Sequence, residues 1–73
     1  MVNKEIIRET LVKYRLEQSR KENIKAYFIF NNNQLDDLLE KMPTTPEELL
    51  KCGGFIAAKV EKYGEEILTI LKG

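Results

Sequence analysis

Residues 49–64 read LLKCGGFIAAKVEKYG and decide the fold, because two helical segments meet there at a pair of glycines. Gly53 and Gly54 can adopt backbone angles that a residue with a Cβ atom resists, so the chain can reverse there with little strain. We therefore predict a helix-turn-helix with a tight glycine corner. Backbone N–H groups at the start of the second helix would be exposed at such a corner, where a phosphate can be held.

The segment before residue 23 predicts a long first helix. Residues 3–22 contain no glycine or proline and are rich in helix-forming residues, so a regular helix of about 30 Å is expected. Ile7, Leu11 and Tyr14 recur at spacings of four and three residues, which indicates a core-facing stripe. Asn23 is a natural stop for this helix.

The apolar run IKAYFIF, residues 24–30, follows that helix. A strand would need a partner strand, and no other stretch of the chain offers one. We therefore predict a short helical turn inserted into the core, with Phe28, Ile29 or Phe30 buried. Asn31 and Gln34 have the spacing of a capping box, which starts the next helix.

The boundaries of the last three helices are also marked in the sequence. Pro43 ends the helix that begins at the capping box. Thr45 can cap the next helix, Pro46 suits its first position, and Glu48 can reach back to the cap amide. Gly64 lies inside the last helix, which indicates close packing or a slight kink. The residues expected to face the core in these helices are Leu35, Leu38, Leu39, Met42, Leu49, Leu50, Cys52, Ile56, Val60, Tyr63, Ile67, Ile70 and Leu71.

Composition bounds the possible functions. The 73 residues suffice for one small domain, and 12 basic residues balance 12 acidic ones, so any binding to nucleic acid should be weak and confined to one face. The chain has one cysteine and no histidine, which excludes an internal disulfide, the common zinc sites and histidine-dependent catalysis. No apolar run approaches the roughly 20 residues that cross a bilayer, and no signal-peptide pattern is present, so a cytoplasmic location is expected.

Several motifs, in order and spacing, together resemble the HRDC domain, the helicase-and-RNase-D C-terminal module. The motifs are Tyr14-Arg15, NIKAYFIFN at residues 23–31, Leu35, Pro43-Thr44-Thr45, Leu49-Leu50, Gly54-Phe55 and KVEKYG at residues 59–64. The resemblance implies an all-α fold, a compact orthogonal, SAM-like bundle of about five helices. It also implies that residues 1–73 are a single domain from the C-terminal region of a larger protein, nearest to a bacterial RecQ-type ATP-dependent DNA helicase.

The resemblance further implies an accessory module without catalysis or a cofactor of its own, whose parent would use ATP and Mg. No nucleophile paired with a base and no Walker-type loop is visible in this chain. Two departures from the family pattern concern the site. Lys25 stands where family members often have proline, and Gly54, Phe55 and Ile56 stand where they usually have glycine, an apolar residue and glycine. The branched Ile56 resists positive φ, so the corner is either a phosphate cradle or a purely structural turn.

Tyr27 is the best candidate for contact with a nucleic-acid strand. An aromatic ring can stack on a base while a neighbouring cation, here Lys25, meets the backbone. The alternative is a core tyrosine whose hydroxyl reaches the surface. Lysines that flank the glycine corner could neutralise phosphates or be ordinary solvated side chains. The predicted nucleic-acid-binding set is Lys25, Tyr27, Asn32, Lys51, Gly54, Lys59 and Lys62, and no catalytic or metal-binding residue is predicted.

Other polar and aromatic residues have structural interpretations. Tyr14 and Tyr63 are expected to pack in the core, Arg15 to pair with a nearby acid, and Cys52 to be a buried small hydrophobe. The tyrosine-lysine turn and the glycine corner are expected to share one exposed side.

Two classes of function follow. The first is weak contact with single-stranded or partly single-stranded DNA by a monomeric domain that does not bind membranes. The second is a docking or regulatory module that contacts the parent's helicase core or another protein. Its docking face would be either Val12 and Leu16 or the acidic helix around Asp36, Asp37 and Glu40. An HRDC domain of an RNase D-type nuclease and a free-standing scaffold are further alternatives.

Overall fold

The computed structural model describes residues 3–53 and 55–73, and these residues form an all-helical bundle with principal extents of 34 × 24 × 19 Å. The elements are α1 (Lys4–Glu22), η1 (Ala26–Phe28), α2 (Asn32–Lys41), α3 (Pro46–Leu50) and α4 (Ala57–Lys72). The predicted fold class is confirmed, although only four of the five helical segments are α-helices, because η1 is a single 3₁₀ turn.

The helices begin and end where short polar residues satisfy their terminal backbone groups. Asn3 caps α1 by accepting from the amides of Glu5 and Ile6, and Asn23 ends it in the left-handed conformation at φ 56°. Asn31 and Gln34 form the predicted capping box of α2. Thr45 caps α3, but the Glu48 carboxylate accepts from the amide and hydroxyl of Thr44, one residue earlier than predicted.

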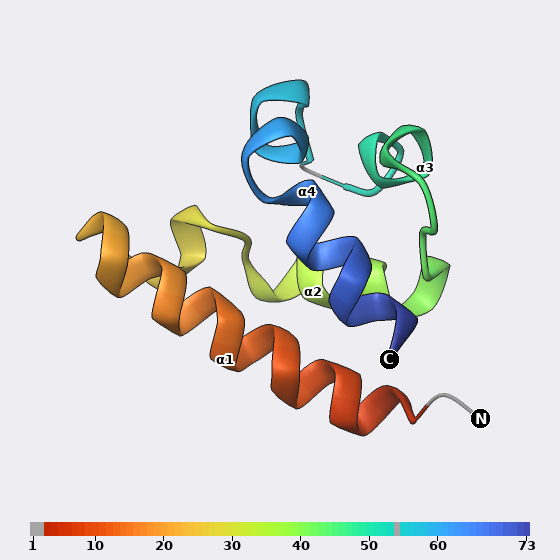
Figure 1. Ribbon diagram of the computed structural model, residues 1–73, viewed down its shortest axis with the longest axis horizontal. Helices are drawn as coiled ribbons and strands as arrows, with labels where there is room; N and C mark the ends of the chain where they lie inside the picture. Colours follow the sequence, from red (N-terminus) through yellow and green to blue (C-terminus); the bar gives the residue numbers. More distant parts are fainter. Residues whose placement is uncertain (1–2, 54) are drawn as a thin grey trace.

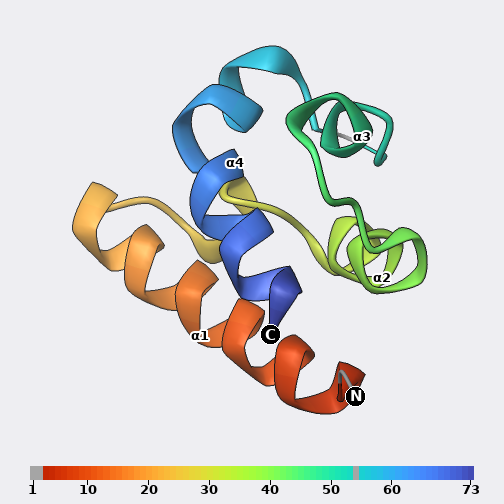
Figure 2. The same ribbon diagram turned by 45° about the vertical axis from the view of Figure 1, so that its right-hand side comes forward.

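Helix α1 lies along one side of the molecule and packs against η1, α2 and α4 (Figures 1 and 2). Helix α3 packs on α4. Gly64 of α4 is at that contact, where an added Cβ would lie 3.3 Å from Leu49 Cδ2 and 3.2 Å from Val60 Cγ1. The glycine therefore allows the two helices to approach closely, as the sequence predicted. None of the described helices combines the length and hydrophobicity needed to span a bilayer.

The core takes side chains from all four α-helices, from the segment after η1 and from the connection between α3 and α4. The buried hydrophobic residues are Ile7, Leu11, Ile29, Phe30, Leu35, Leu38, Leu49, Cys52, Phe55, Tyr63, Ile67 and Leu71. The burial expected among residues 28–30 is found at Ile29 and Phe30, while Phe28 is 54% exposed. Two expectations about the core were wrong, since Leu50 and Ile56 are exposed by 45% and 62%. Ile56 is outside the stripe of α4 because it is the N-cap residue, in extended conformation at φ −89°, rather than part of the helix.

Candidate nucleic-acid interface

The turn that carries Lys25 and Tyr27 is fixed by the way α1 ends. With Asn23 left-handed, the amide of Ile24 bonds back to the carbonyl of Ser19 at 3.0 Å and turns the chain off the helix. Lys25 is extended, and η1 closes with a 3.0 Å bond from the amide of Phe28 to the carbonyl of Lys25. This tight turn leaves Tyr27 and Phe28 outside the core.

Tyr27 and Phe28 form an exposed aromatic pair. Each residue is 54% exposed, and their ring centroids are 4.7 Å apart at an interplanar angle of 39°. Lys25 Nζ lies 5.8 Å from the centroid of the Tyr27 ring, within the range of a cation-π contact. We call Lys25, Tyr27 and Phe28 the aromatic platform. It presents two aromatic rings, on which a base could stack, beside one cation, which could pair with the phosphate of the same strand.

Arg15 of α1 binds the segment that follows the platform in sequence. Its Nη1 donates to the carbonyl oxygen of Phe30 at 3.2 Å and to Oδ1 of Asn32 at 3.1 Å, and the guanidinium lies 5.5 Å from the Phe30 ring centroid. The expectation of an ion pair with an acid was therefore wrong among the described residues. Asn32 is one of the predicted nucleic-acid contacts, and its side-chain oxygen accepts this hydrogen bond from Arg15.

One amide of the glycine corner is bonded within the chain. The amide of Gly53 donates to Asp37 Oδ2 at 2.7 Å, so it is not free to bind a phosphate, as a structural turn requires. This bond, with Lys41 Nζ at 3.2 Å, lowers the pKa of Asp37. The backbone of Gly53 is not in the left-handed region. Gly54, the other predicted corner residue, lies outside the described residues.

The start of α4 keeps part of the expected anion-binding character. Ile56 caps the helix without a side-chain hydrogen bond, and the first turn holds no acidic residue. Lys59 lies in this turn and is partly exposed. The positive end of the helix dipole and one cation are thus present beside the corner.

The predicted lysines lie in different surroundings. Lys62 is engaged by α1, because its Nζ pairs with Oε1 of Glu22, and this bond is the main cause of its raised pKa. Lys51 and Lys59 have no ion-pair partner among the described residues. Lys51 and Gly53 line a polar hollow of about 370 Å³ together with Asn31 and Asn33, which follow the platform in sequence. The structure therefore brings Gly53 beside the start of α2.

Comparison with known proteins relates this geometry to a family. The family model of the HRDC domain matches residues 5–71, which is nearly the whole chain. The chain belongs to the HRDC family. The HRDC domain 3 of D. radiodurans RecQ is a similar solved structure, with a TM-score of 0.90 at 28% sequence identity, over 97% of this chain and 93% of that one.

The curated relatives that contain a similar HRDC domain are helicases. ATP-dependent DNA helicase UvrD2 of Mycobacterium tuberculosis is 33% identical over 63 residues, which is 86% of this chain and 9% of that protein. ATP-dependent DNA helicase RecQ of Pasteurella multocida is 36% identical over 52 residues, 71% of this chain and 8% of that protein. The chain thus spans less than a tenth of the length of these relatives.

In this HRDC domain a polar cluster ties the end of α1, next to the platform, to α4. Glu22 accepts hydrogen bonds from Lys62 Nζ, from Tyr63 Oη at 2.6 Å and from Gln18 Nε2 at 3.1 Å. These bonds, that of Lys62 first, lower the pKa of Glu22 to about 2. Burial, followed by the bond to Glu22, raises the pKa of Tyr63. Helix α1 is therefore anchored to α4 just before the platform begins.

Phe28 is the platform residue that sequence reasoning missed. The capping box contained the missing signal, since it makes Phe30 the residue before the N-cap of α2 and Leu35 the fourth residue of that helix. These two positions pack together in a hydrophobic staple, and both residues are buried here. Assigning Phe30 to the core in this way leaves Phe28 as the aromatic residue that need not be buried.

Proposed function

We propose that this HRDC domain is the accessory single-strand-contacting module of a larger RecQ-type ATP-dependent DNA helicase. The observation that supports this most is the aromatic platform, in which two half-exposed rings and a cation lie together on the surface. Large exposed aromatic residues side by side are unfavourable in water unless something covers them. Bases of a single strand can cover them without being read for sequence.

The charges beside the platform suit a weak and salt-dependent contact. Arg15 and Lys25 lie at the platform, and Lys51 and Lys59 lie beside the glycine corner without an ion-pair partner among the described residues. With a net charge of zero over the whole chain, the affinity should come from these few basic residues and fall as salt is added. Strand separation itself would belong to the rest of the parent, which would use ATP and Mg.

The test is fluorescence anisotropy with a labelled single-stranded oligothymidine at low salt. Tyr27→Ala should weaken binding about 5- to 150-fold, the range that corresponds to about 1–3 kcal/mol of stacking. Tyr27→Phe keeps the ring and should bind like the wild type. The stability of both variants should change little because the ring is half exposed.

Matched lysine variants separate the platform from general charge. Lys25→Ala should weaken binding, while Lys4→Ala at the far end of α1 removes the same charge about 27 Å along the helix from residue 22 and should not. Equal affinity of Tyr27→Ala and the wild type, or equal losses for the two lysine variants, would contradict the proposal.

Docking onto the rest of the parent is a second candidate, supported by one surface feature. Val12 and Leu16 lie one turn apart on α1 and are 37% and 43% exposed. The acidic helix is a poorer candidate, because Asp36 pairs with Arg8 and Asp37 with Lys41. Val12→Ser/Leu16→Ser should abolish nuclear magnetic resonance shifts caused by the parent's remaining domains, and unchanged shifts would exclude this face.

A further inference from the structure

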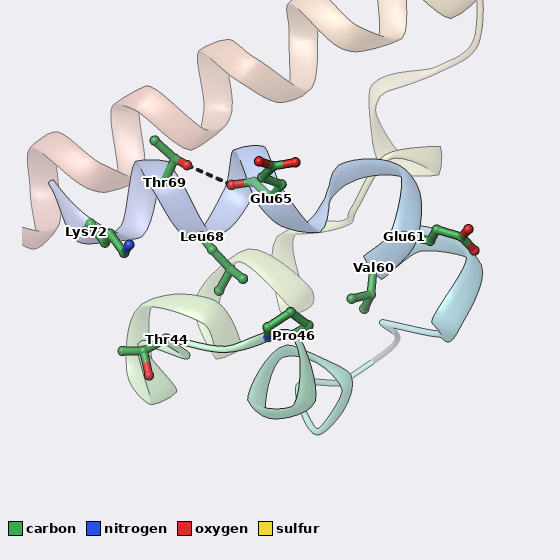
Figure 3. A pocket seen from close by; sticks show the side chains of 8 residues that line it. All are labelled: Thr44, Pro46, Val60, Glu61, Glu65, Leu68, Thr69 and Lys72. Carbon is green, nitrogen blue, oxygen red and sulfur yellow. Dashed lines mark hydrogen bonds between the residues drawn. The ribbon is translucent and has the colours of Figure 1, made fainter.

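A second surface of the domain, between α4 and the start of α3, is hollowed. The hollow has a volume of about 510 Å³ and is lined by Thr44, Pro46, Val60, Glu61, Glu65, Leu68, Thr69 and Lys72. In Figure 3 the side chains of Val60 and Leu68 extend from α4 toward Pro46, and the carboxylates of Glu61 and Glu65 point away from this apolar floor. None of these residues belongs to the aromatic platform.

The charged residues Glu61, Glu65 and Lys72 form the rim of the hollow, and the two acidic residues lie on neighbouring turns of α4. Glu61 and Glu65 are four residues apart on α4, a spacing at which two carboxylates repel each other. Neither has an ion-pair partner among the described residues. Lys72 lies at the other end of the hollow, two turns from Glu65. The free domain therefore presents an unpaired negative rim beside an apolar floor, with a cation only at the far end.

These features identify the chemistry of an occupant. The rim favours a cation and repels a phosphate backbone, while the floor favours an aliphatic side chain. An open hollow of this kind suits a protein segment better than a small molecule, since small-molecule sites bury most of their ligand. We propose that this hollow docks a segment of another polypeptide in which arginine or lysine alternates with leucine-like residues.

The experiment is a two-dimensional nuclear magnetic resonance titration of the labelled domain with synthetic peptides. The first probe is the capped peptide acetyl-SLRLRS-amide, which should shift the amides of Val60, Glu61, Glu65, Leu68 and Thr69. Two matched peptides serve as controls. Acetyl-SSRSRS-amide keeps the charge without the leucines, and acetyl-SLELES-amide keeps the leucines with reversed charge, so neither should saturate the same amides.

A pair of charge-matched variants tests the rim. Glu61→Gln/Glu65→Gln should raise the Kd for the first peptide about fivefold, the loss expected for two exposed ion pairs. Glu9→Gln/Glu17→Gln removes the same charge from exposed positions on α1 and should leave the Kd unchanged. Both doubles keep the fold, because no described hydrogen bond or ion pair involves these four side chains.

Several results would overturn the proposal. It fails if the three peptides give equal shifts, or if both double variants weaken binding equally. It also fails if the first peptide shifts amides elsewhere, or none at all, at millimolar concentration. Shifts of the same amides by a single-stranded oligonucleotide would make the hollow part of a nucleic-acid face. Concentration-dependent self-association that Glu61→Gln/Glu65→Gln abolishes would make a second copy the occupant.

Discussion

Two tyrosine hydroxyls, one on α4 and one on α1, should respond differently to replacement of the tyrosine by phenylalanine. Tyr63 on α4 is 4% exposed and donates its hydroxyl hydrogen bond to the ionised Glu22 at 2.6 Å. The hydroxyl oxygen of Tyr14 on α1 is also buried, but the residues that the structure describes offer it no hydrogen-bond partner. Burial, followed by the nearby charge of Glu66, raises the pKa of Tyr14.

The magnitudes follow from these two environments. Tyr63→Phe removes a hydrogen bond to a charged group and should lower the free energy of unfolding by about 1.5–3 kcal/mol. That is a large part of the roughly 4–11 kcal/mol expected for a domain of this size. Tyr14→Phe removes a buried hydroxyl oxygen for which the described residues supply no hydrogen-bond partner, so the free energy of unfolding should stay the same or rise by up to about 1 kcal/mol.

Urea unfolding followed by far-UV circular dichroism at neutral pH measures both effects. Thermal unfolding should agree, because about 1 kcal/mol corresponds to about 4–8 °C in a domain of this length. Tyr63→Phe should therefore lower the Tm by roughly 6–24 °C, while Tyr14→Phe should not lower it. Equal destabilisation by the two substitutions would refute the reasoning, because it would mean that the hydrogen bond of Tyr63 to Glu22 adds no more stability than the Tyr14 hydroxyl does.

Two further predictions concern the anchor and the corner. The pKa of Glu22 is about 2 in the folded state and 4.5 in the reference state, so its contribution to stability is present above about pH 4.5 and lost as the pH falls toward 2. The Tm difference between the wild type and Glu22→Gln should thus shrink over that range, and a constant difference would contradict the assignment. Gly53→Ala should leave stability unchanged or raise it by about 0.4–1 kcal/mol in urea unfolding, because an added Cβ lies 3.7 Å from Asp37 Oδ2 and φ is not left-handed. A clear loss would show that the corner does require glycine at this position.

The helix boundaries could be predicted from the sequence because they depend on local chemistry. The Asn31 and Gln34 pair, the Thr45 cap and the stop at Asn23 each involve groups within four residues of one another. The burial of the residues next to a boundary was harder to predict. Leu50 and Ile56 have core-like side chains but occupy the last turn of α3 and the cap of α4, where the chain turns away from the core.

The partners of the candidate site depend on contacts distant in sequence, and no local pattern contains them. Asp37 reaches the amide of Gly53 across 16 residues, and Glu22 reaches Lys62 and Tyr63 across 40 and 41. By residue type alone, Lys62 and Lys59 are equally good candidates for a phosphate contact. The packing of α1 on α4 distinguishes them, because it pairs Lys62 with Glu22. The exposure of the Tyr27 ring, left open by the sequence, follows from the tight turn that η1 makes after α1.

These contacts also explain why the aromatic platform can be rigid although it is exposed. Its three residues lie between two fixed points, the Glu22 cluster at the end of α1 and the buried Ile29 and Phe30. Arg15 adds a third by binding the carbonyl oxygen of Phe30. A surface ordered before binding loses little conformational entropy when a strand arrives. Loosening the anchor with Tyr63→Phe should therefore weaken oligonucleotide binding even though Tyr63 is buried and not part of the platform. Unchanged affinity in a folded Tyr63→Phe variant would show that the platform does not depend on that anchor.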